Sequence, residues 1–300
     1  MTAHPFHQVD VFADGEFSGN PLAVIHEADD LPPDRMQNIT RWTNLSEAAF
    51  LSQPSPGSMG ESDADYRVRI FDPKAELPFA GHPTLGACAA WLDAGGVPRR
   101  DGIVVQECGA GLIEILVGTG ASGGGSGNGR SGAVRNLAFA APPMIRHEPV
   151  TAPDLDRAMR VLGLTDADVV SSHWIDNGPG WMGLQLTDAR RVLDVEMPTE
   201  RADRFDVGVV GLHSHGSVGH GSADIEVRAF FNDPSGSIRE DPVTGSLNAS
   251  IAQWLVGKGT LPVSYQARQT TGLVSVDARE DGTVWVGGRI DVRVAGSIDV

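Results

Sequence analysis

The 300-residue sequence predicts an α+β protein of two similar halves, each a curved or barrel-like β-sheet wrapped around one central apolar helix. Two observations lead to this prediction. Short runs rich in Val, Ile and Leu recur along the whole chain between turn residues, as in proteins built from many short strands. Two segments, 75–92 and 240–255, consist mainly of small and apolar residues and resemble each other. A helix without a polar face has to be buried on all sides, and a sheet rolled around it provides that cover.

The two apolar segments form an internal repeat. Each begins Glu-x-Pro-x-x-Gly, at 76–81 and 240–245, and continues as a helix-forming run that ends in Trp-Leu, at 91–92 and 254–255. A glycine follows each run, Gly95 and Gly257, where a left-handed C-terminal cap costs least. We therefore expect one buried helix at the same place in each half.

Two further helices follow from the spacing of apolar residues. In segment 31–44 the expected buried face is Met36, Ile39 and either Trp42 or Thr43. In segment 152–164 it is Leu155, Ala158, Met159 and Leu162. Pro33 suits a first helical turn and Gly163 suits a helix end, so both segments also carry their own start or stop signal.

A Gly/Ser tract at 118–134 separates the two halves and has the composition of a flexible linker. We expect a first domain at 1–120, a linker at 121–132 and a second domain at 133–300, with the strands from about 270 able to return to the first domain. A long hairpin loop inside a single domain is the alternative for this tract.

Composition excludes several classes of protein. The formal net charge of −16 argues against a nucleic-acid partner, which usually needs a clustered basic face. No apolar run is long enough for a membrane span, and no secretory leader is visible at the N-terminus. The two cysteines, Cys88 and Cys108, are too few for a disulfide framework and are expected to be small core residues. These features predict a cytoplasmic protein.

The entrances of the two apolar helices are the expected binding site. The first backbone N–H groups of a helix and its macrodipole attract anions, and Gly81 and Gly245 let a ligand approach the backbone closely. Pro83 is expected at the first helical position with His82 extended before it, while Thr244 or Ser246 caps the second helix. If the two entrances face each other across a cleft, they would bind a small carboxylate between two positive poles.

Three side chains near these entrances could transfer protons. His82 titrates near neutral pH, Asp241 stands just before the second helix, and Glu47 lies at a helix-to-strand junction. Solvated loop or capping roles are the alternative for all three. A zinc site at His213, His215 and His220 is disfavoured because the stretch has the Gly/Ser content of a loop. Neither a metal nor a cofactor is expected.

Four motifs resemble the PhzF (phenazine biosynthesis-like) family: "DVFADGEFSGNPLAVI", "NLSEAAFL", "ELPFAGHPTLGA" and "EDPVTGSLNA". The resemblance implies a fold like that of diaminopimelate epimerase and a homodimer. It implies that Glu47 is the catalytic general acid/base and that His82 and Asp241 support it. Gly81 and Ser246 fall where related racemases carry paired cysteines, so a two-thiol mechanism is not available. The implied reaction is a cofactor-independent isomerisation of a small cyclic carboxylate such as trans-2,3-dihydro-3-hydroxyanthranilate.

One segment departs from the family pattern. A Gln-Gly run and a following Gly-Arg pair are common there, whereas 267–276 reads "ARQTTGLVSV", with Thr270 after Gln269. If this loop contacts substrate, the chain acts on a different molecule. The alternatives are a racemase or epimerase of an amino-acid-like substrate, and a catalytically idle relative that binds a small carboxylate or a protein partner.

Overall fold

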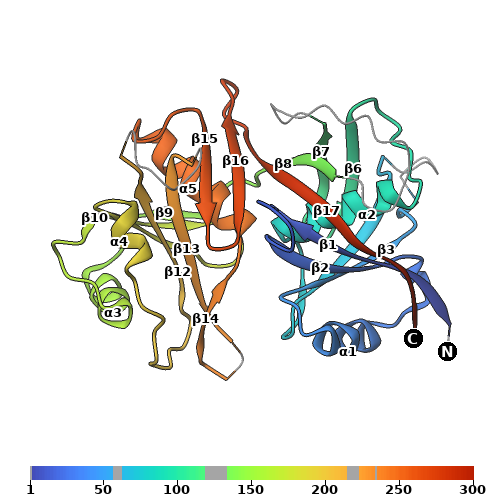
Figure 1. Cartoon of the computed structure of the whole chain (residues 1–300), viewed down its shortest axis with the longest axis horizontal. Helices are drawn as coiled ribbons and strands as arrows, with labels where there is room; N and C mark the ends of the chain where they lie inside the picture. Colours follow the sequence, from blue (N-terminus) through green and yellow to red (C-terminus); the bar gives the residue numbers. More distant parts are fainter. Residues whose placement is uncertain (1, 57–62, 119–133, 215–222, 234) are drawn as a thin grey trace. The chain divides into compact units, whose positions relative to one another are not determined.

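The computed structural model describes residues 2–56, 63–118, 134–214, 223–233 and 235–300. Its contacts divide the chain into two compact units, Met1–Ala140 with Gly287–Val300, and Ala141–Val286 (Figure 1). The expected linker at 121–132 lies outside the described residues. The first unit extends past the expected boundary because the strand that follows, β8 (Val134–Ala140), pairs with β7 (Gly111–Val117) of the first unit.

The sheet of the first unit closes into a barrel of eight strands. In spatial order these are β17 (Val284–Asp299), β1 (Ala3–Val11), β2 (Asn20–Ile25), β3 (Ala48–Ser52), β4 (Tyr66–Phe71), β6 (Ile103–Cys108), β7 and β8, which pairs again with β17. The pairs β2–β3 and β4–β6 are parallel. A short strand, β5 (Glu76–Leu77), also lies on β4. Only the last part of the predicted C-terminal return, from Gly287, belongs to this unit, and it brings the two ends of the chain side by side (Figure 1).

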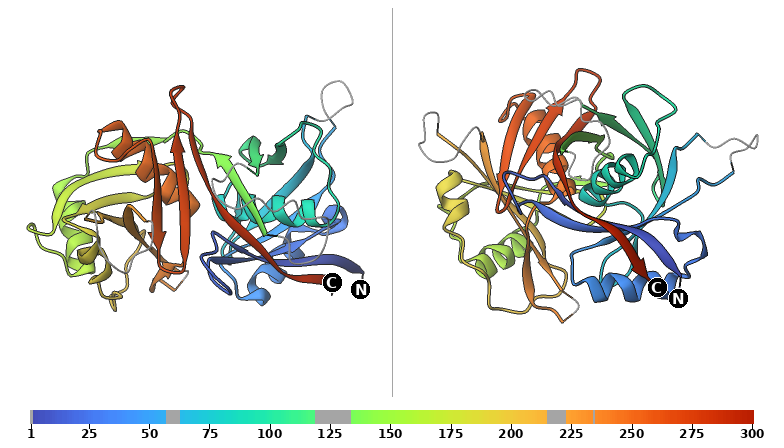
Figure 2. Two further views of the ribbon diagram at one scale, coloured as in Figure 1. Left: turned by 45° about the horizontal axis from the view of Figure 1, so that its top comes forward. Right: turned by 45° about the vertical axis from the view of Figure 1, so that its right-hand side comes forward.

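Helix α2 (Gly81–Asp93) fills this barrel (Figure 2). Its residues from Gly81 to Ala90 are all buried, and it contacts β1, β2, β3, β6 and β8. The close fit needs a glycine in the middle of the helix: a Cβ at Gly86 would stand 2.6 Å from Leu22 Cδ2 and 3.0 Å from a Val11 methyl carbon. Helix α1 (Pro33–Thr43) covers the outside of β2 and β3 through Met36 and Ile39. Of the two alternatives for its third contact, Trp42 is exposed and Thr43 is half-buried.

The second unit repeats this plan. Its strands are, in spatial order, β9 (Arg146–Glu148), β10 (Val169–Asp176), β11 (Met182–Leu186), β12 (Asp206–Leu212), β13 (Ile225–Asn232), β15 (Ser264–Gln269) and β16 (Gly272–Ala278). β14 (Ile238–Asp241) and β15 pair with the same edge of β13. In the first unit, β5 and β6 pair with the same edge of β4 in the same way. Helix α5 (Gly245–Gly257) is buried against this sheet, and α3 (Ala152–Leu162) and α4 (Ala189–Leu193) supply a second core.

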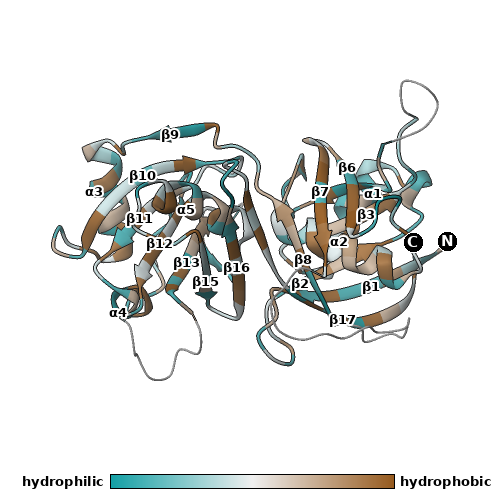
Figure 3. Cartoon of the chain, turned by 90° about the horizontal axis from the view of Figure 1, so that it is seen from above, coloured by the Kyte–Doolittle hydropathy of each residue, from teal (hydrophilic) through white to brown (hydrophobic). Residues whose placement is uncertain are grey.

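The internal repeat is confirmed strand by strand. Each unit runs antiparallel, parallel, antiparallel and parallel along β1–β2–β3–β4–β6 and along β10–β11–β12–β13–β15. Each central helix has 13 residues and starts at the glycine of the repeated motif, Gly81 or Gly245. Both helices are predominantly apolar (Figure 3), which is why each is covered by a sheet. None of the helices in the described ranges is long and apolar enough to cross a bilayer.

Candidate active site

Glu47, His82 and Asn20 lie together at one end of the first barrel. Helix α1 ends at Asn44 in a left-handed conformation with φ 58°, and the chain reaches β3 at Ala48, so Glu47 immediately precedes that strand. Parallel pairing of Ala23 with Ala48 places Glu47 beside the start of β2, where Asn20 is the first residue. His82 is the second residue of α2. Three elements therefore converge on one carboxylate.

The three side chains form a chain of polar contacts. His82 Nε2 lies 3.4 Å from Glu47 Oε2, and His82 Nδ1 lies 3.4 Å from Asn20 Nδ2. Asn20 is fully buried and His82 is 4 % exposed. The side chain of Glu47 keeps 18 % exposure, so it alone of the three retains access to solvent or to a ligand.

The surroundings of His82 fix its charge and its tautomer. Burial lowers the pKa of His82 to about 3, so the imidazole is neutral at physiological pH. An amide nitrogen can only donate, so Asn20 Nδ2 donates to Nδ1 and the ring proton resides on Nε2, facing Glu47. The site thus presents Glu47 with a neutral hydrogen-bond donor.

Acid should destabilise the protein through its buried histidines. Burial lowers the pKa of His26 to about 4, with the neighbouring His7 as a second cause, and that of His82 to about 3. Below pH 6.5 the unfolded chain takes up protons that the folded chain refuses, so stability falls as pH falls towards these values. We expect a loss of about 1.6 kcal/mol per histidine between pH 6.5 and 5, because the unfolded histidine is already half-protonated at pH 6.5. Urea unfolding at both pH values measures this loss, and His26→Gln should reduce it; an unchanged pH dependence in that variant would contradict the assignment.

In the second unit, polar groups gather around the start of α5. Asp241 ends β14, and its Oδ2 accepts a hydrogen bond from Thr244 Oγ1 at 2.5 Å. Ser246, the second residue of α5, accepts from Trp181 Nε1 at its Oγ, 3.0 Å, and from Asn177 Nδ2 at its carbonyl oxygen, 3.0 Å. All of these contacts lie within one unit. They hold the helix entrance and the adjacent carboxylate in a fixed arrangement.

The helix starts differ from the expected ones by two residues in the first repeat. Ala80 is the N-cap of α2 and Gly81 its first residue. His82, expected just before the helix, and Pro83, expected at its first position, therefore both lie inside the first turn. Pro83 is tolerated there because first-turn N–H groups have no partner within the helix. Thr244 is the N-cap of α5, but its hydroxyl binds Asp241 and does not cap. Neither first turn carries an acidic side chain, but the Asp241 carboxylate lies beside the start of α5, so the entrance of α2 is the one better suited to an anion.

The structure therefore groups the predicted residues into two sets. Glu47, His82 and Gly81 belong to the first unit, and Asp241, Gly245 and Ser246 belong to the second. Sequence reasoning missed four residues that hold them: Asn20, Asn177, Trp181 and Gln269. Asn20 belongs to the Gly-Asn-Pro of the motif "DVFADGEFSGNPLAVI", and this motif could have pointed to it. Asn177 and Trp181 lie in loops that carry no recognisable motif.

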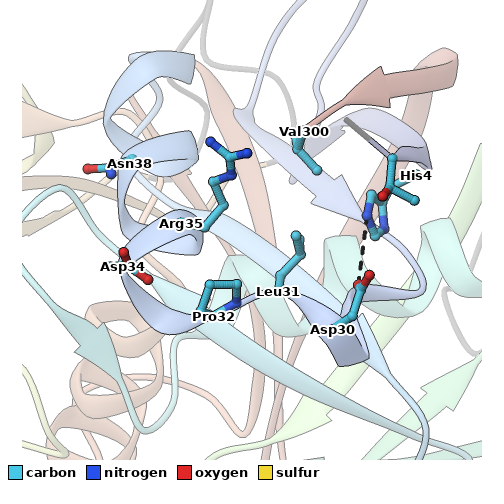
Figure 4. A pocket seen from close by; sticks show the side chains of 9 residues that line it. His4, Asp30, Leu31, Pro32, Asp34, Arg35, Asn38 and Val300 are labelled. Atoms are coloured by element: carbon cyan, nitrogen blue, oxygen red, sulfur yellow. Dashed lines mark ion pairs between the residues drawn. The ribbon is translucent and has the colours of Figure 1, made fainter.

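The remaining candidates fall outside these sets. Cys88 is buried in α2, where burial raises its pKa, whereas Cys108 is only half-buried, so it is not the core residue expected. His213 Nε2 contacts Glu226 Oε2 at 3.1 Å, while His215 and His220 lie outside the described residues. Within the described ranges no cluster of three metal-ligating side chains occurs. A separate pocket of about 390 Å³, lined by His4, Asp30 and Arg35 among others, contains none of the predicted site residues (Figure 4).

The structure thus has two repeated units, each built around a buried helix, and places the Glu47 carboxylate beside the buried imidazole of His82 at the entrance of the first helix. The model of the PhzC-PhzF family, described as phenazine biosynthesis-like protein, matches residues 9–295. The chain belongs to this family.

Sequence relatives extend over the whole chain or over part of it. Antisense-enhancing sequence 1 of Schizosaccharomyces pombe is 31% identical, covering 99% of both chains. An uncharacterized isomerase of Pasteurella multocida is 30% identical, covering 97% of this chain and 92% of its own. The trans-2,3-dihydro-3-hydroxyanthranilate isomerase of Pseudomonas fluorescens is 48% identical over 87 residues, 29% of each chain. Proteins named as isomerases thus occur both among the relatives that match the whole chain and among those that match only part of it.

Solved structures share the fold over the full length. A PhzF-family protein of Enterococcus faecalis superposes with a TM-score of 0.71 at 23% identity, covering 100% of both chains. A hydroxyproline epimerase of Agrobacterium vitis, solved with bound trans-4-hydroxy-L-proline, gives a TM-score of 0.61 at 12% identity, covering 99% of this chain and 92% of its own. The predicted epimerase-like fold is confirmed.

Proposed function

We propose that this chain is a cofactor-independent isomerase that moves a proton between two carbons of a small cyclic carboxylate such as trans-2,3-dihydro-3-hydroxyanthranilate. The observation that carries the proposal is the contact of partly exposed Glu47 with a buried, neutral His82. A carboxylate in such a place can accept a proton from carbon and return it. The local likeness to isomerases of that compound supports this substrate class.

In the proposed reaction Glu47 acts first as base and then as acid. Its carboxylate takes a proton from one ring carbon: the C–H bond breaks, an O–H bond forms on Glu47, and the electron pair delocalises into the conjugated ring. The same O–H then protonates a second carbon, which restores the carboxylate. His82 Nε2 lies 3.4 Å from the Glu47 carboxylate, and the ring stays neutral throughout because its burial disfavours the imidazolium. It holds the carboxylate towards the substrate.

We propose that each helix entrance, taken by itself, can bind a polar or anionic group of a ligand. Gly81 and Gly245 begin the two central helices, and their first turns offer backbone N–H groups and positive dipole ends. Ser246 and Asp241 add a hydroxyl and a carboxylate beside the second entrance. Charge that develops on the substrate would be stabilised by donors already in place.

A second candidate is an epimerase that uses Glu47 as a single base on an amino-acid-like substrate. The fold shared with a hydroxyproline epimerase favours keeping this candidate. A two-thiol version has no support, because Gly81 and Ser246 stand at the positions that cysteines would occupy and Cys88 is buried inside α2. The resemblance also implies a homodimer, which light scattering would test, and the composition predicts a cytoplasmic protein, which cell fractionation would test.

Hydrogen exchange at carbon tests both candidates. The protein is incubated in D₂O with trans-2,3-dihydro-3-hydroxyanthranilate, or with a panel of small carboxylates that includes proline derivatives, and the C–H signals are followed by NMR. Loss of a ring C–H signal supports the isomerase. Exchange confined to the α-carbon of an amino acid supports the epimerase. Binding of these compounds with no exchange on any of them would overturn both and favour an idle carboxylate-binding relative.

A further inference from the structure

A buried network of side chains connects Gln269 to Asp241 at the start of α5. Gln269, at the end of β15, is fully buried. Its Oε1 accepts from the backbone N–H of Thr244 at 3.0 Å and from Asn248 Nδ2 at 2.8 Å. Its Nε2 lies 3.1 Å from the carbonyl oxygen of Asp241 and 3.0 Å from Thr244 Oγ1. All four residues lie in the second unit.

The chemistry of these groups allows one direction of hydrogen bonding. A backbone N–H only donates and a backbone carbonyl only accepts, so the two ends of the Gln269 amide are assigned without ambiguity. Nε2 therefore donates to the Thr244 hydroxyl oxygen. That hydroxyl has a single proton, which is then directed to Asp241 Oδ2, 2.5 Å away. The amide of Gln269 thus sets where the proton of Thr244 points.

We propose that Gln269 is a positioning residue that acts through the Thr244 hydroxyl to hold Asp241 as an oriented, ionised carboxylate at the entrance of α5. The arrangement of Gln269, Thr244 and Asp241 does not depend on the proposed function. Only the role of Asp241 in the reaction rests on it. The divergent segment 267–276 contacts β14 at two successive residues. Gln269 donates to the carbonyl oxygen of Asp241, and Thr270 donates to Glu240 Oε1 at 2.7 Å. The segment thus holds the end of β14 by hydrogen bonds.

Charged side chains on β13, β14 and β15 interact with one another. Glu240 of β14 forms a two-point ion pair with Arg228 of β13, at 2.8 and 2.7 Å. Glu226 of β13 and Arg268 of β15 interact electrostatically with each other. Helix α5 carries no charged residue. Thr244→Val removes the hydroxyl that donates to Asp241 and leaves the ion pair of Arg228 with Glu240 in place.

The test is an NMR titration of the Asp241 carboxyl carbon in protein labelled with ¹³C-aspartate, the signal being assigned with Asp241→Asn. Thr244→Val removes the donor and should raise the pKa of Asp241 by about one unit or more. Thr244→Ser keeps a hydroxyl and should restore the wild-type value. Gln269→Glu, once ionised, accepts from the hydroxyl and turns its proton away, so it should raise the pKa at least as much.

Gln106 supplies a matched control. It is fully buried on β6, the counterpart of β15, and donates to Thr84 Oγ1 of α2 at 3.1 Å without touching Asp241. Gln106→Glu should leave the pKa of Asp241 unchanged. An equal pKa in folded Thr244→Val and wild type, or a failure of Thr244→Ser to restore it, would overturn the inference. If Gln269→Glu does not fold, the Thr244 pair decides. Because the titration needs no substrate, absence of carbon exchange would refute the proposed function and leave this inference standing.

Discussion

Glu47→Gln should abolish measurable proton transfer. Glutamine keeps the size of the side chain and an oxygen that can accept from His82 Nε2, but it can neither take up nor return a proton. General acid–base catalysis by one side chain contributes roughly 10²- to 10⁴-fold, and Glu47 is proposed to serve both steps, so we expect a loss at the upper end of that range. The rate of deuterium incorporation at carbon in D₂O measures it.

A matched variant separates this chemical effect from a change in folding. Glu107 of β6 is also a half-buried glutamate of the first unit, with 20% exposure against 18% for Glu47. Its carboxylate accepts from Ser55 instead of contacting His82. Glu107→Gln should therefore retain the exchange rate. Equal rates in Glu47→Gln and wild type would remove Glu47 from the reaction, whatever the substrate.

Gly19→Ala should cause a large loss of stability and of activity together. Gly19 has φ +87°, and a Cβ there would stand 2.3 Å from the carbonyl oxygen of Val11 and 3.0 Å from the amide nitrogen of Ala13. Both contacts are with backbone, which cannot rotate away. We expect a cost of about 3 kcal/mol or more, from the left-handed conformation and from the overlap. Because Asn20 follows directly, the contact with His82 should be disturbed as well.

Gly15→Ala isolates the conformational part of that cost. Gly15 lies in the same turn with φ +120°, but a Cβ there meets no atom within 4 Å. It should lose about 1–2 kcal/mol and keep its activity. Chemical denaturation and the exchange assay on both variants make the comparison. Equal losses in the two variants would show that the close approach to Val11 is not needed.

The sequence by itself determined the repeated architecture and most of the candidate side chains. A helix of small and apolar residues has to be enclosed, and it occurs twice in this chain, so two sheet-wrapped units follow from composition and spacing alone. The junction position of Glu47 also followed from local signals, since α1 ends at Thr43 and β3 begins at Ala48. These features depend on short stretches of chain whose own chemistry decides the outcome.

Only the tertiary structure decided how the side chains are held and what protonation state they have. Asn20 reaches His82 across 62 residues of sequence, and Gln269 reaches Thr244 across 25, through strand pairing that no local pattern specifies. The pKa of His82 falls because the barrel excludes water from it, which is a property of the assembled barrel and not of the Gly-His-Pro motif. Likewise Thr244, one of the two capping candidates in the sequence, donates its hydroxyl proton to Asp241 and accepts from the buried amide of Gln269, two contacts that only the packing of β14 and β15 brings about. The residue types determine which protonation states and hydrogen bonds are possible, and the packing of the folded chain determines which of them form.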